Sequence, residues 1–438
     1  MTTAIICRLT SIRKHPNADK LNLATVLGNQ VVIGLEHVDG ELGMFVPTDM
    51  QLSHIYCLEN NLYTLSAQAK LGLPAGAAGY LSEKRRVRSQ RFRGEKSDGI
   101  FMPLSSLFWV GEATFKEGDA ITEVNGNLIC EKYYTPATLR AMKVGTAKTR
   151  KENLCFPKHK ETAQFRFHAE SIPEDAVLYI TEKLHGTSGR LGHVLNELPF
   201  PKWKQFLNTN IFHRGFFKPK STYTYLNGSK NVILGKSSDT NGGYYGTNDF
   251  REEVVQGITL HKGELIFFEI VGYVHDNVPI MPLHDVTKTG LKDIQKAFGN
   301  SIHYTYGQPE GTRKIYVYKI ATVNEDGQMM ELSWPAMVGR CNELGLPHVP
   351  LLFGPTTLPH LAHIYSTDGR SALRTVVEQL SAGTQGSTLN QAQIREGVVV
   401  RVESKDGVSQ LKSKSFEFGV LEGYLSEDDS FVDPEVVS

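Results

Sequence analysis

Three segments of the chain each place a charged side chain inside an otherwise apolar, strand-like run. Lys183 lies in YITEKLHGTS, Glu269 in IFFEIVG, and Glu396 in REGVVVR, which is followed by Lys412 and Lys414 in LKSKS. A lysine in a pocket with other cations loses its proton more readily and becomes a nucleophile. A buried carboxylate needs a charge partner, a metal or a donor, and a lysine pair suits a phosphate. A phosphate-binding lysine pair that faces a metal-binding carboxylate is a chemically sensible combination.

Each segment also has a plainer interpretation when it is considered alone. Lys183 could be a solvated lysine at a strand end, and Glu269 could face water from an edge strand. Period-two alternation places Glu269 on the face of Phe267 and Val271. The turn Asp406-Gly407 predicts a hairpin that brings the two lysines near Glu396, or else an exposed hairpin with no function.

Taken in order, these residues resemble the motifs of the covalent nucleotidyltransferases, which comprise DNA ligases, RNA ligases and mRNA capping guanylyltransferases. In RKIYVYKI, Tyr318 resembles the residue that stacks on the nucleobase, with Tyr316 as the alternative. Ser229 and Lys230 in GSKNV resemble the segment that contacts ribose and phosphate, although many members have Arg at the position of Lys230.

Further residues narrow the resemblance to the fifth RNA ligase family. TEKLHGTS is the RNA-ligase form of the nucleophile motif, and Glu182 resembles the residue that recognises the adenine amino group. His185 stands where many relatives have an Asp that holds the water shell of the metal. RSQRFRG and SDGI in the first hundred residues resemble the N-terminal OB domain of this family. The resemblance covers about residues 1–420.

The resemblance implies an ATP-dependent RNA ligase that seals 3′-OH/5′-phosphate breaks, with nicks that have an RNA 3′-OH strand as the favoured substrate. Lys183 would form a lysyl–AMP, Lys412 and Lys414 would hold the α-phosphate, and Glu269 and Glu396 would place Mg²⁺ or Mn²⁺. The alternatives are a GTP-dependent capping-type guanylyltransferase, or a nucleic-acid-binding protein without catalysis. A single P-loop-like ending, GKS, lacks the earlier glycine of that motif.

The elements that position these residues fall into two halves. Residues 1–135 read as short strands separated by turns, with little helical periodicity, which predicts an OB-type β-barrel. Within it, KRRVRSQRFRGEK carries seven basic residues and one acid. We expect Arg88, Arg91, Phe92 and Arg93 to contact the nucleic-acid backbone there.

From Val177 onward, strand-like runs alternate with helix-like ones, of which SWPAMVGRCNEL is the best punctuated. The predicted fold class is α+β: the OB-type barrel, then a nucleotidyltransferase (ATP-grasp-like ligase) domain of antiparallel sheets with flanking helices. The expected boundaries are 1–135 for the barrel, 136–165 for a basic linker, 166–420 for the adenylyltransferase domain and 421–438 for an acidic tail.

Composition sets the remaining expectations. The 438 residues include 47 Lys+Arg and 47 Asp+Glu, and this zero net charge taken alone argues against a nucleic-acid partner. The charges are nevertheless separated along the sequence into basic segments and an acidic end. The net charge therefore does not decide whether the protein binds nucleic acid. No apolar run is long enough to span a bilayer, and the five scattered cysteines suit a reducing compartment. We therefore expect a cytoplasmic monomer that binds RNA and no membrane.

Overall fold

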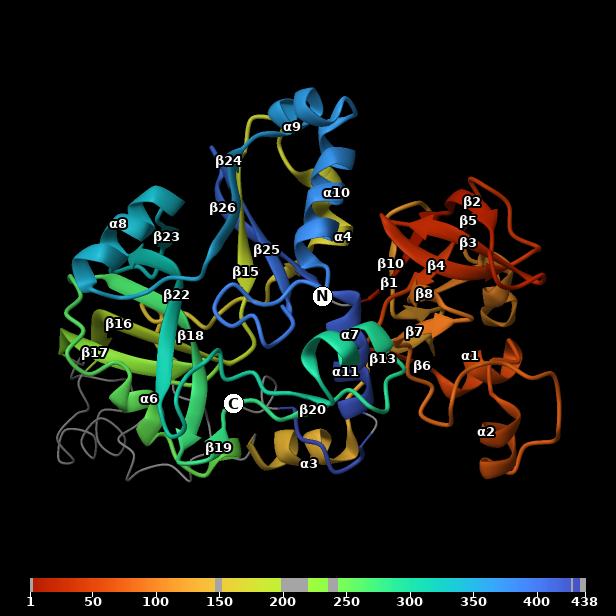
Figure 1. Cartoon of the computed structure of the whole chain (residues 1–438), viewed down its shortest axis with the longest axis horizontal. Coiled ribbons are helices and arrows are strands. Elements are labelled where there is room, and N and C mark those ends of the chain that lie inside the picture. The colour runs from red at the N-terminus through yellow and green to blue at the C-terminus, as the bar shows by residue number, and fades with distance from the viewer. Residues whose placement is uncertain (1–2, 146–151, 198–219, 235–242, 427, 434–438) are drawn as a thin grey trace, which may run out of the picture.

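The protein is described here from a computed structural model that covers residues 3–145, 152–197, 220–234, 243–426 and 428–433. The fold is mixed α+β, and within these ranges all strand pairs but that of β14 (Ala163–Gln164) with β26 (Gly407–Lys414) are antiparallel. Figure 1 shows the N-terminal third, in red and orange, beside two larger sheets built from the rest of the chain. In the described part, no helix is long and apolar enough to cross a membrane.

The N-terminal third consists of short strands, as predicted. Its sheets have the orders β10-β1-β5-β9, β2-β3-β4, β13-β6, β7-β8 and β11-β12. The strands are β1 (Ala4–Arg8), β2 (Thr10–Lys14), β3 (Leu21–Val26), β4 (Asn29–Gly34), β5 (Leu42–Val46), β6 (Met50–Leu52), β7 (Ser89–Phe92), β8 (Glu95–Asp98), β9 (Ile100–Pro103), β10 (Ala120–Ile121), β11 (Glu123–Val124), β12 (Asn127–Leu128) and β13 (Cys130–Lys132). Alternating residues of these strands, such as Ala4, Ile6, Met44 and Val46, are buried in one core.

Three short helical segments interrupt these strands, although little helical periodicity was expected there. They are α1 (His54–Glu59), α2 (Leu65–Lys70) and the 3₁₀ helix η1 (Leu104–Val110). The first two begin at side-chain caps, because the hydroxyls of Ser53 and Thr64 accept backbone N–H bonds. A further helix, α3 (Pro136–Gly145), lies within the range expected to be a linker. Each is too short to show a strong period in the sequence.

The second part of the chain contains two larger sheets. The first has the order β14-β26-β25-β15-β24, and the second has β17-β16-β18-β22-β23 with β19 beside β18. The strands are β14 (Ala163–Gln164), β15 (Val177–Lys183), β16 (Thr187–Glu197), β17 (Ser221–Ser229), β18 (Glu264–His275), β19 (Val278–Pro279), β20 (His284–Asp285), β21 (Ser301–Ile302), β22 (Arg313–Val323), β23 (Met329–Glu331), β24 (Leu351–Thr356), β25 (Gly397–Ser404) and β26 (Gly407–Lys414). The expected hairpin of β25 and β26 is confirmed.

Helices cover one face of the first sheet. Leu178 and Ile180 of β15 and Val398 and Val400 of β25 pack with apolar residues of the helices above them (Figure 1). These helices are α4 (Phe165–His168), α9 (Leu358–Tyr365) and α10 (Gly369–Ser381). The opposite face of the same strands is therefore available for a site.

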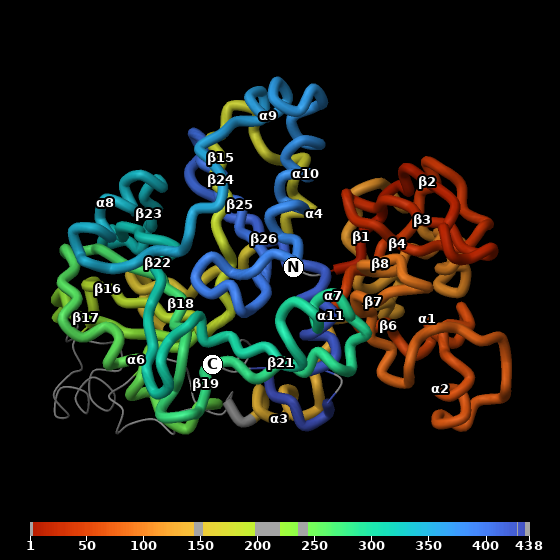
Figure 2. The backbone as a smooth tube through the Cα atoms, in the orientation of Figure 1, coloured from red at the N-terminus to blue at the C-terminus, as the bar shows by residue number. Residues whose placement is uncertain are grey.

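The remaining helices surround the second sheet and the chain end. They are α6 (Asp249–Glu253), α7 (Lys292–Phe298), α8 (Trp334–Leu344) and α11 (Phe416–Leu425), with the 3₁₀ helix η4 (Gly243–Tyr245), whereas the 3₁₀ helix η2 (Ala169–Ser171) packs beside α4 and α10 at the first sheet. The predicted helix at Ser333–Leu344 is confirmed as α8, with Ser333 as N-cap and Gly345 as a left-handed C-cap. Figure 2 shows α11 running back toward β7 of the N-terminal third, which it contacts.

Candidate active site

The strand register places the predicted nucleophile and a predicted phosphate-binding lysine in one row. Lys183 of β15 pairs with Gly397 of β25, which pairs in turn with Lys414 of β26. Residues opposite one another in neighbouring strands share a face of the sheet, so the two lysines lie on the same face. Gly397 is required between them, because a Cβ there would lie 2.1 Å from the carbonyl oxygen of Ser413.

The carboxylate of Glu396 lies between these two ammonium groups. Lys183 Nζ donates to Glu396 Oε2 at 2.8 Å, and Lys414 Nζ is 3.8 Å from Glu396 Oε1. The Glu396 side chain is fully buried, whereas those of Lys183 and Lys414 keep about a fifth of their surface exposed. The predicted proximity of Glu396 to the lysines of β26 is thus present for Lys414.

Glu269 enters the site from the middle of the second sheet. Its strand, β18, pairs with β16 on one side and β22 on the other, so the alternative of a water-facing edge strand is wrong. Glu269 Oε2 accepts a hydrogen bond from Ser188 Oγ at 3.0 Å. Gly186 permits this approach, since a Cβ on it would lie 2.3 Å from the Ile270 carbonyl oxygen and 3.1 Å from Glu269 Cγ.

A cavity of about 100 Å³ lies between the two sheets, next to the nucleophile. Lys183, Glu269 and Tyr318 line it, together with His159 and Trp334. Flat aromatic rings beside a lysine and a carboxylate are suited to a nucleotide, whose base needs stacking and whose phosphates need charge.

The strand β22 presents its two candidate tyrosines differently. Its pairing shifts between Phe267 and Phe268 of β18, so that Phe267 faces Lys319 while Phe268 faces Val317. Tyr318 is therefore the extra residue of a bulge, which re-aims its side chain. Burial and the nearby charge of Glu269 raise the pKa of Tyr318. Tyr316 pairs with Glu269, packs in the large core, and does not line the cavity.

Positive charge gathers around His159, which lies at the wall of this cavity. Its ring meets that of Tyr318 edge-on at 5.5 Å. Burial lowers the pKa of His159 to about 3, and the charges of Lys230, Lys319 and Lys412 add to that effect. A neutral imidazole surrounded by ammonium groups marks an environment that favours an anion such as a phosphate chain.

Glu182 also lines this cavity. Leu178 and Ile180 point toward the covering helices, and strand alternation turns the Glu182 side chain away from that of Lys183. The Glu182 side chain is fully buried, and Oε2 accepts from the backbone N–H of Thr388 at 2.9 Å, whereas Oε1 has no hydrogen-bond partner among the described residues. The expected contact of Glu182 with an adenine amino group stays a prediction.

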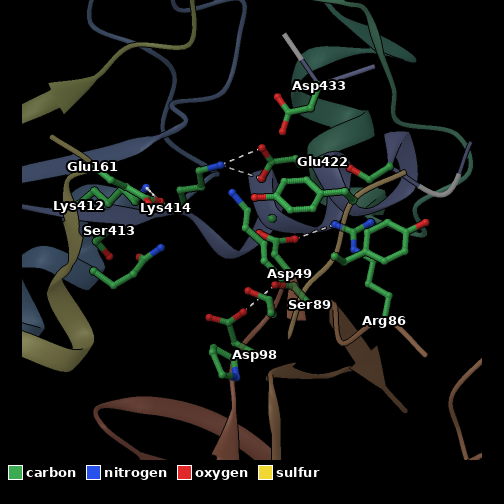
Figure 3. A pocket seen from close by; sticks show the side chains of 18 of the residues that line it. Asp49, Arg86, Ser89, Asp98, Glu161, Lys412, Ser413, Lys414, Glu422 and Asp433 are labelled. Atoms are coloured by element: carbon green, nitrogen blue, oxygen red, sulfur yellow. Dashed lines mark hydrogen bonds and ion pairs between the residues drawn. The ribbon is translucent and has the colours of Figure 1, made fainter. Parts of the chain in front are cut away.

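A second cavity, of about 150 Å³, separates the N-terminal third from the catalytic strands. Figure 3 shows ion pairs on both sides of it: Lys414 with Glu422, Lys412 with Glu161, and Arg86 with Asp49. Lys412 and Lys414 line this cavity, as does Lys230. Neither Lys412 nor Lys414 lines the cavity beside Lys183 and Tyr318, so the two lysines of β26 lie at the junction of the two halves rather than beside the aromatic rings.

The hydroxyl of Ser229 binds the backbone of its own turn. Ser229 is buried at the end of β17, and its hydroxyl accepts the backbone N–H of Val232 at 3.3 Å in the following turn. It lines neither cavity. Of the two predicted ribose and phosphate contacts, only Lys230 thus faces a cavity.

The predicted nucleic-acid residues lie on and around the β7–β8 hairpin. Arg93 is exposed in its turn, and Phe92 packs edge-on against Tyr80 at 6.3 Å. Arg88 lies over the ring of Tyr424 at 5.5 Å, and Arg91 lies over Phe416 at 5.4 Å. Two of these four predicted residues, Arg88 and Arg91, are therefore in contact with α11, which was not expected.

Several buried residues of the site were not predicted. Arg251 donates to the Ser188 carbonyl at 3.0 Å and to Thr187 Oγ1 at 2.7 Å, which supports the start of β16, from which Ser188 donates to Glu269. Arg190 lies over the ring of Phe156 at 4.5 Å, and Arg401 lines the cavity beside Lys183 and Tyr318. An arginine within an apolar run was the available signal for Arg401, whereas Arg190 follows a polar Gly/Thr/Ser segment and Arg251 lies in a polar helix, so neither gave a signal.

The acidic side chains fit a divalent ion of the Mg²⁺ or Mn²⁺ type. Glu269 on β18 lines the cavity beside Lys183, and Glu396, directly before β25, contacts Lys183, so both supply hard carboxylate oxygens near the nucleophile. No group of three or more His, Cys, Asp or Glu side chains arranged for a metal occurs among the described residues. Mg²⁺ is commonly bound by one or two carboxylates with phosphate oxygens and water completing the shell, so this sparse set is suitable.

Comparisons with known proteins agree on one family. A family model described as RNA ligase matches residues 176–415. Solved structures of a Naegleria gruberi RNA ligase are similar over nearly the whole chain. The form with PPi has 15% identity and a TM-score of 0.57, covering 98% of this chain and 100% of that one.

A variant of that ligase with ATP and Mn has 15% identity, a TM-score of 0.55 and the same coverage. A second variant, with AMP and Mn, gives equal values. No curated protein matches the sequence. At this identity the structural likeness establishes the fold, including the placement of a β-rich part before the catalytic part.

Proposed function

Because this chain belongs to the RNA ligase family, whose members are ATP-dependent enzymes, we propose that it seals 3′-OH/5′-phosphate breaks through a covalent lysyl–AMP. The favoured substrate is a nick with an RNA 3′-OH strand. The observation that supports the proposal most directly is the contact of Lys183 with the buried carboxylate of Glu396, in register with Lys414.

In the first step, the neutral amine of Lys183 attacks the α-phosphorus of ATP. A nitrogen–phosphorus bond forms, the bond to the β-phosphate oxygen breaks, and pyrophosphate leaves. Tyr318 stacks on the base in the cavity, while Lys230, Lys412 and Lys414 attract phosphate oxygens. Glu269 and Glu396 would hold Mg²⁺ or Mn²⁺, which when bound neutralises phosphate charge and favours the neutral amine.

The second and third steps use the nucleic acid. A 5′-phosphate oxygen attacks the phosphorus of lysyl–AMP, the phosphorus–nitrogen bond breaks, and the amine of Lys183 is regenerated. The 3′-OH then attacks the adenylylated 5′-phosphate, AMP leaves, and a phosphodiester forms. Lys183 is needed only for the first two of these steps.

The N-terminal third is proposed to be an OB-type module that binds the nucleic acid. Its short antiparallel sheets and the basic β7–β8 hairpin support this assignment. The domain boundaries predicted above remain predictions. A cytoplasmic, monomeric enzyme belongs to the same proposal, supported by five cysteines that are all buried and unbridged.

A labelling experiment tests the proposal. The protein is incubated with α-³²P-ATP or α-³²P-GTP and Mn²⁺, and covalent label is measured in the wild type and in Lys183→Ala. Label from ATP that is absent in the variant is expected. Label from GTP alone would indicate a capping-type enzyme, and no label from either would leave a nucleic-acid-binding protein.

Transfer to nucleic acid is tested separately. The labelled protein is mixed with a nicked duplex that carries an RNA 3′-OH, and sealing is compared with that of a single-stranded break. Sealing of the nick at the higher rate is expected. Equal sealing of both would contradict the nick preference while leaving the ligase assignment in place.

A further inference from the structure

Glu182, before the nucleophile Lys183, and His185, after it, are both connected to one loop. This loop, residues 382–395, joins α10 to β25 and ends directly before Glu396. It is ordered by its own backbone: Ser387 N donates to the Gln393 carbonyl at 2.9 Å, and Gly386 forms a bridge with Ile394. A loop fixed in this way can hold other groups in place.

Before the nucleophile, the loop holds Glu182. Oε2 of Glu182 accepts the backbone N–H of Thr388 at 2.9 Å and lies 3.8 Å from Nε of Arg395. Both side chains are buried, and that of Glu182 has no exposed surface. A carboxylate enclosed by a backbone donor and a guanidinium is held in one orientation.

Arg395 connects that carboxylate to the loop itself. Its guanidinium donates to the carbonyls of Leu380 at 2.6 Å and Gly386 at 3.3 Å. Its backbone leads directly into Glu396, the partner of Lys183. Movement of Arg395 would therefore shift Glu182 and Glu396 together.

After the nucleophile, the same loop acts through Tyr306. Oε1 of Gln393 accepts the backbone N–H of Tyr306 at 3.0 Å, and the Tyr306 hydroxyl accepts the backbone N–H of His185 at 2.6 Å. Tyr306 is 3% exposed and has a φ of 54°, a conformation that only surrounding contacts maintain in a residue of this size. The backbone that follows Lys183 is thus fixed from the same side as Glu182.

We propose that Glu182, Arg395 and Tyr306 form a clamp that positions Lys183 against Glu396. The three are positioning residues in this clamp, since each acts through the backbone or through another side chain. The inference rests on the proposed function for its meaning in catalysis, and it adds a positioning role to the adenine-recognition role that the sequence resemblance implies for Glu182.

The first test separates positioning from base recognition. Glu182→Gln, Arg395→Lys and Tyr306→Phe are compared with the wild type in steady-state exchange of labelled pyrophosphate into ATP or into its 6-oxo analogue ITP, which reports nucleotidyl transfer to Lys183 and its reversal. A misplaced nucleophile lowers the kcat of exchange by about 10- to 100-fold. Tyr306 lines neither cavity, so Tyr306→Phe should leave the KM for ATP and the preference for ATP over ITP unchanged. An altered ATP:ITP preference in Tyr306→Phe, or an unaltered kcat in all three variants, would overturn the clamp.

A second readout does not depend on ATP. Acylation of Lys183 by acetic anhydride in the free protein is followed by mass spectrometry, with the 90% exposed Lys405 as internal reference. A lysine no longer held against a buried carboxylate is less shielded, so the clamp variants should acylate Lys183 about 3- to 10-fold faster relative to Lys405. Equal rates in wild type and variants would refute the clamp even if the wild type forms no lysyl–AMP.

A matched arginine controls for lost stability. Arg340 also donates to a largely buried carboxylate, Glu264, at 2.7 and 2.9 Å, but lies on α8 and lines neither cavity. Arg340→Lys should lower the melting temperature without changing kcat or Lys183 acylation. If Arg340→Lys and Arg395→Lys lower the melting temperature equally and also lower kcat equally, the clamp is refuted. Absence of ATP labelling in the wild type would instead refute the proposed function.

Discussion

At the scale of single residues, the site depends on one buried carboxylate shared by two lysines. Glu396 contacts Lys183 at 2.8 Å and Lys414 at 3.8 Å, and it has no exposed side-chain surface. A buried anion is stable only because these cations compensate it. The same arrangement leaves the amine and a phosphate-binding lysine on one face, where an incoming phosphate would replace the carboxylate as partner.

The first prediction concerns that carboxylate. Glu396→Gln removes the shared charge, so Lys183 and Lys414 repel each other and the ion-binding pair with Glu269 is incomplete. Covalent labelling by α-³²P-ATP should fall by at least about 100-fold. Glu343→Gln, which alters an exposed partner of Arg340, should label normally. Wild-type labelling of Glu396→Gln would exclude a role for this residue in the first step.

The second prediction concerns acid stability. The pKa of His159 is about 3 in the folded protein, because of burial and neighbouring lysines, against an ordinary value of 6.5. The unfolded chain therefore binds more protons between these values, so the stability is fully present above pH 6.5 and is lost as the pH falls toward 3. In urea titrations, His159→Gln should lose less unfolding free energy over this range.

His284 supplies a check on that prediction. Burial lowers its pKa to about 4, and Lys414 adds to the effect. The double variant with His284→Gln should show the flattest profile of stability against pH. A profile as steep as that of the wild type would show that other groups dominate acid unfolding.

At the scale of elements, the site is built where β15 leaves one sheet and β16 enters the other. The turn between them carries Gly186, which lies against the backbone of β18. Neither sheet alone contains the site, since Lys183 comes from the first and Glu269 from the second. The turn therefore sets the distance between nucleophile and carboxylate.

The third prediction addresses this turn. In Gly186→Ala, the new Cβ would lie 2.3 Å from the Ile270 carbonyl, so the backbone must shift. We expect a loss of about 1–3 kcal/mol in unfolding free energy and slower adenylylation. Gly339→Ala, in α8, places its Cβ in open space and should stabilise the protein slightly. Equal stability of the two variants would contradict the packing argument.

At the scale of the whole molecule, α11 joins the two halves. Arg86 donates to the Gly423 carbonyl at 2.9 Å, and Lys84 pairs with Asp429 at 2.8 Å. The same helix carries Glu422, which holds Lys414 at 2.8 Å through both oxygens. The acidic end of the chain thus pairs with basic residues inside the protein, so part of the positive charge counted in the sequence is neutralised there.

The fourth prediction tests a basic residue of the β7–β8 hairpin that is exposed and has no described stacking contact with α11. Arg93 is exposed in the β7–β8 turn, whereas Arg88 and Arg91 also contact α11. Arg93→Glu should leave adenylylation unchanged but weaken nick binding and lower the slope of log affinity against log salt by about 1. Arg8→Glu, an exposed arginine on β1, is the matched control. Equal nick affinity in both variants would remove Arg93 from the interface.

The sequence alone determined the features that depend on neighbouring residues. Alternation located β15, β18 and β25, the Asp406-Gly407 turn predicted the hairpin, and Ser333 with Gly345 delimited α8, because each signal lies within a few residues. The order of the charged residues along these strands was likewise sufficient to reveal the resemblance to the RNA ligases.

Only the tertiary structure decided which partner each charged residue has. Arg86 and Gly423 meet across 337 positions, and Glu182 meets Thr388 across 206, distances over which no local pattern carries information. For that reason the direction of Glu182, the neutral His159 among lysines, and the contact of α11 with the basic hairpin could not be predicted. They follow from tertiary packing, because local sequence does not determine which face of a strand or helix contacts a distant part of the chain.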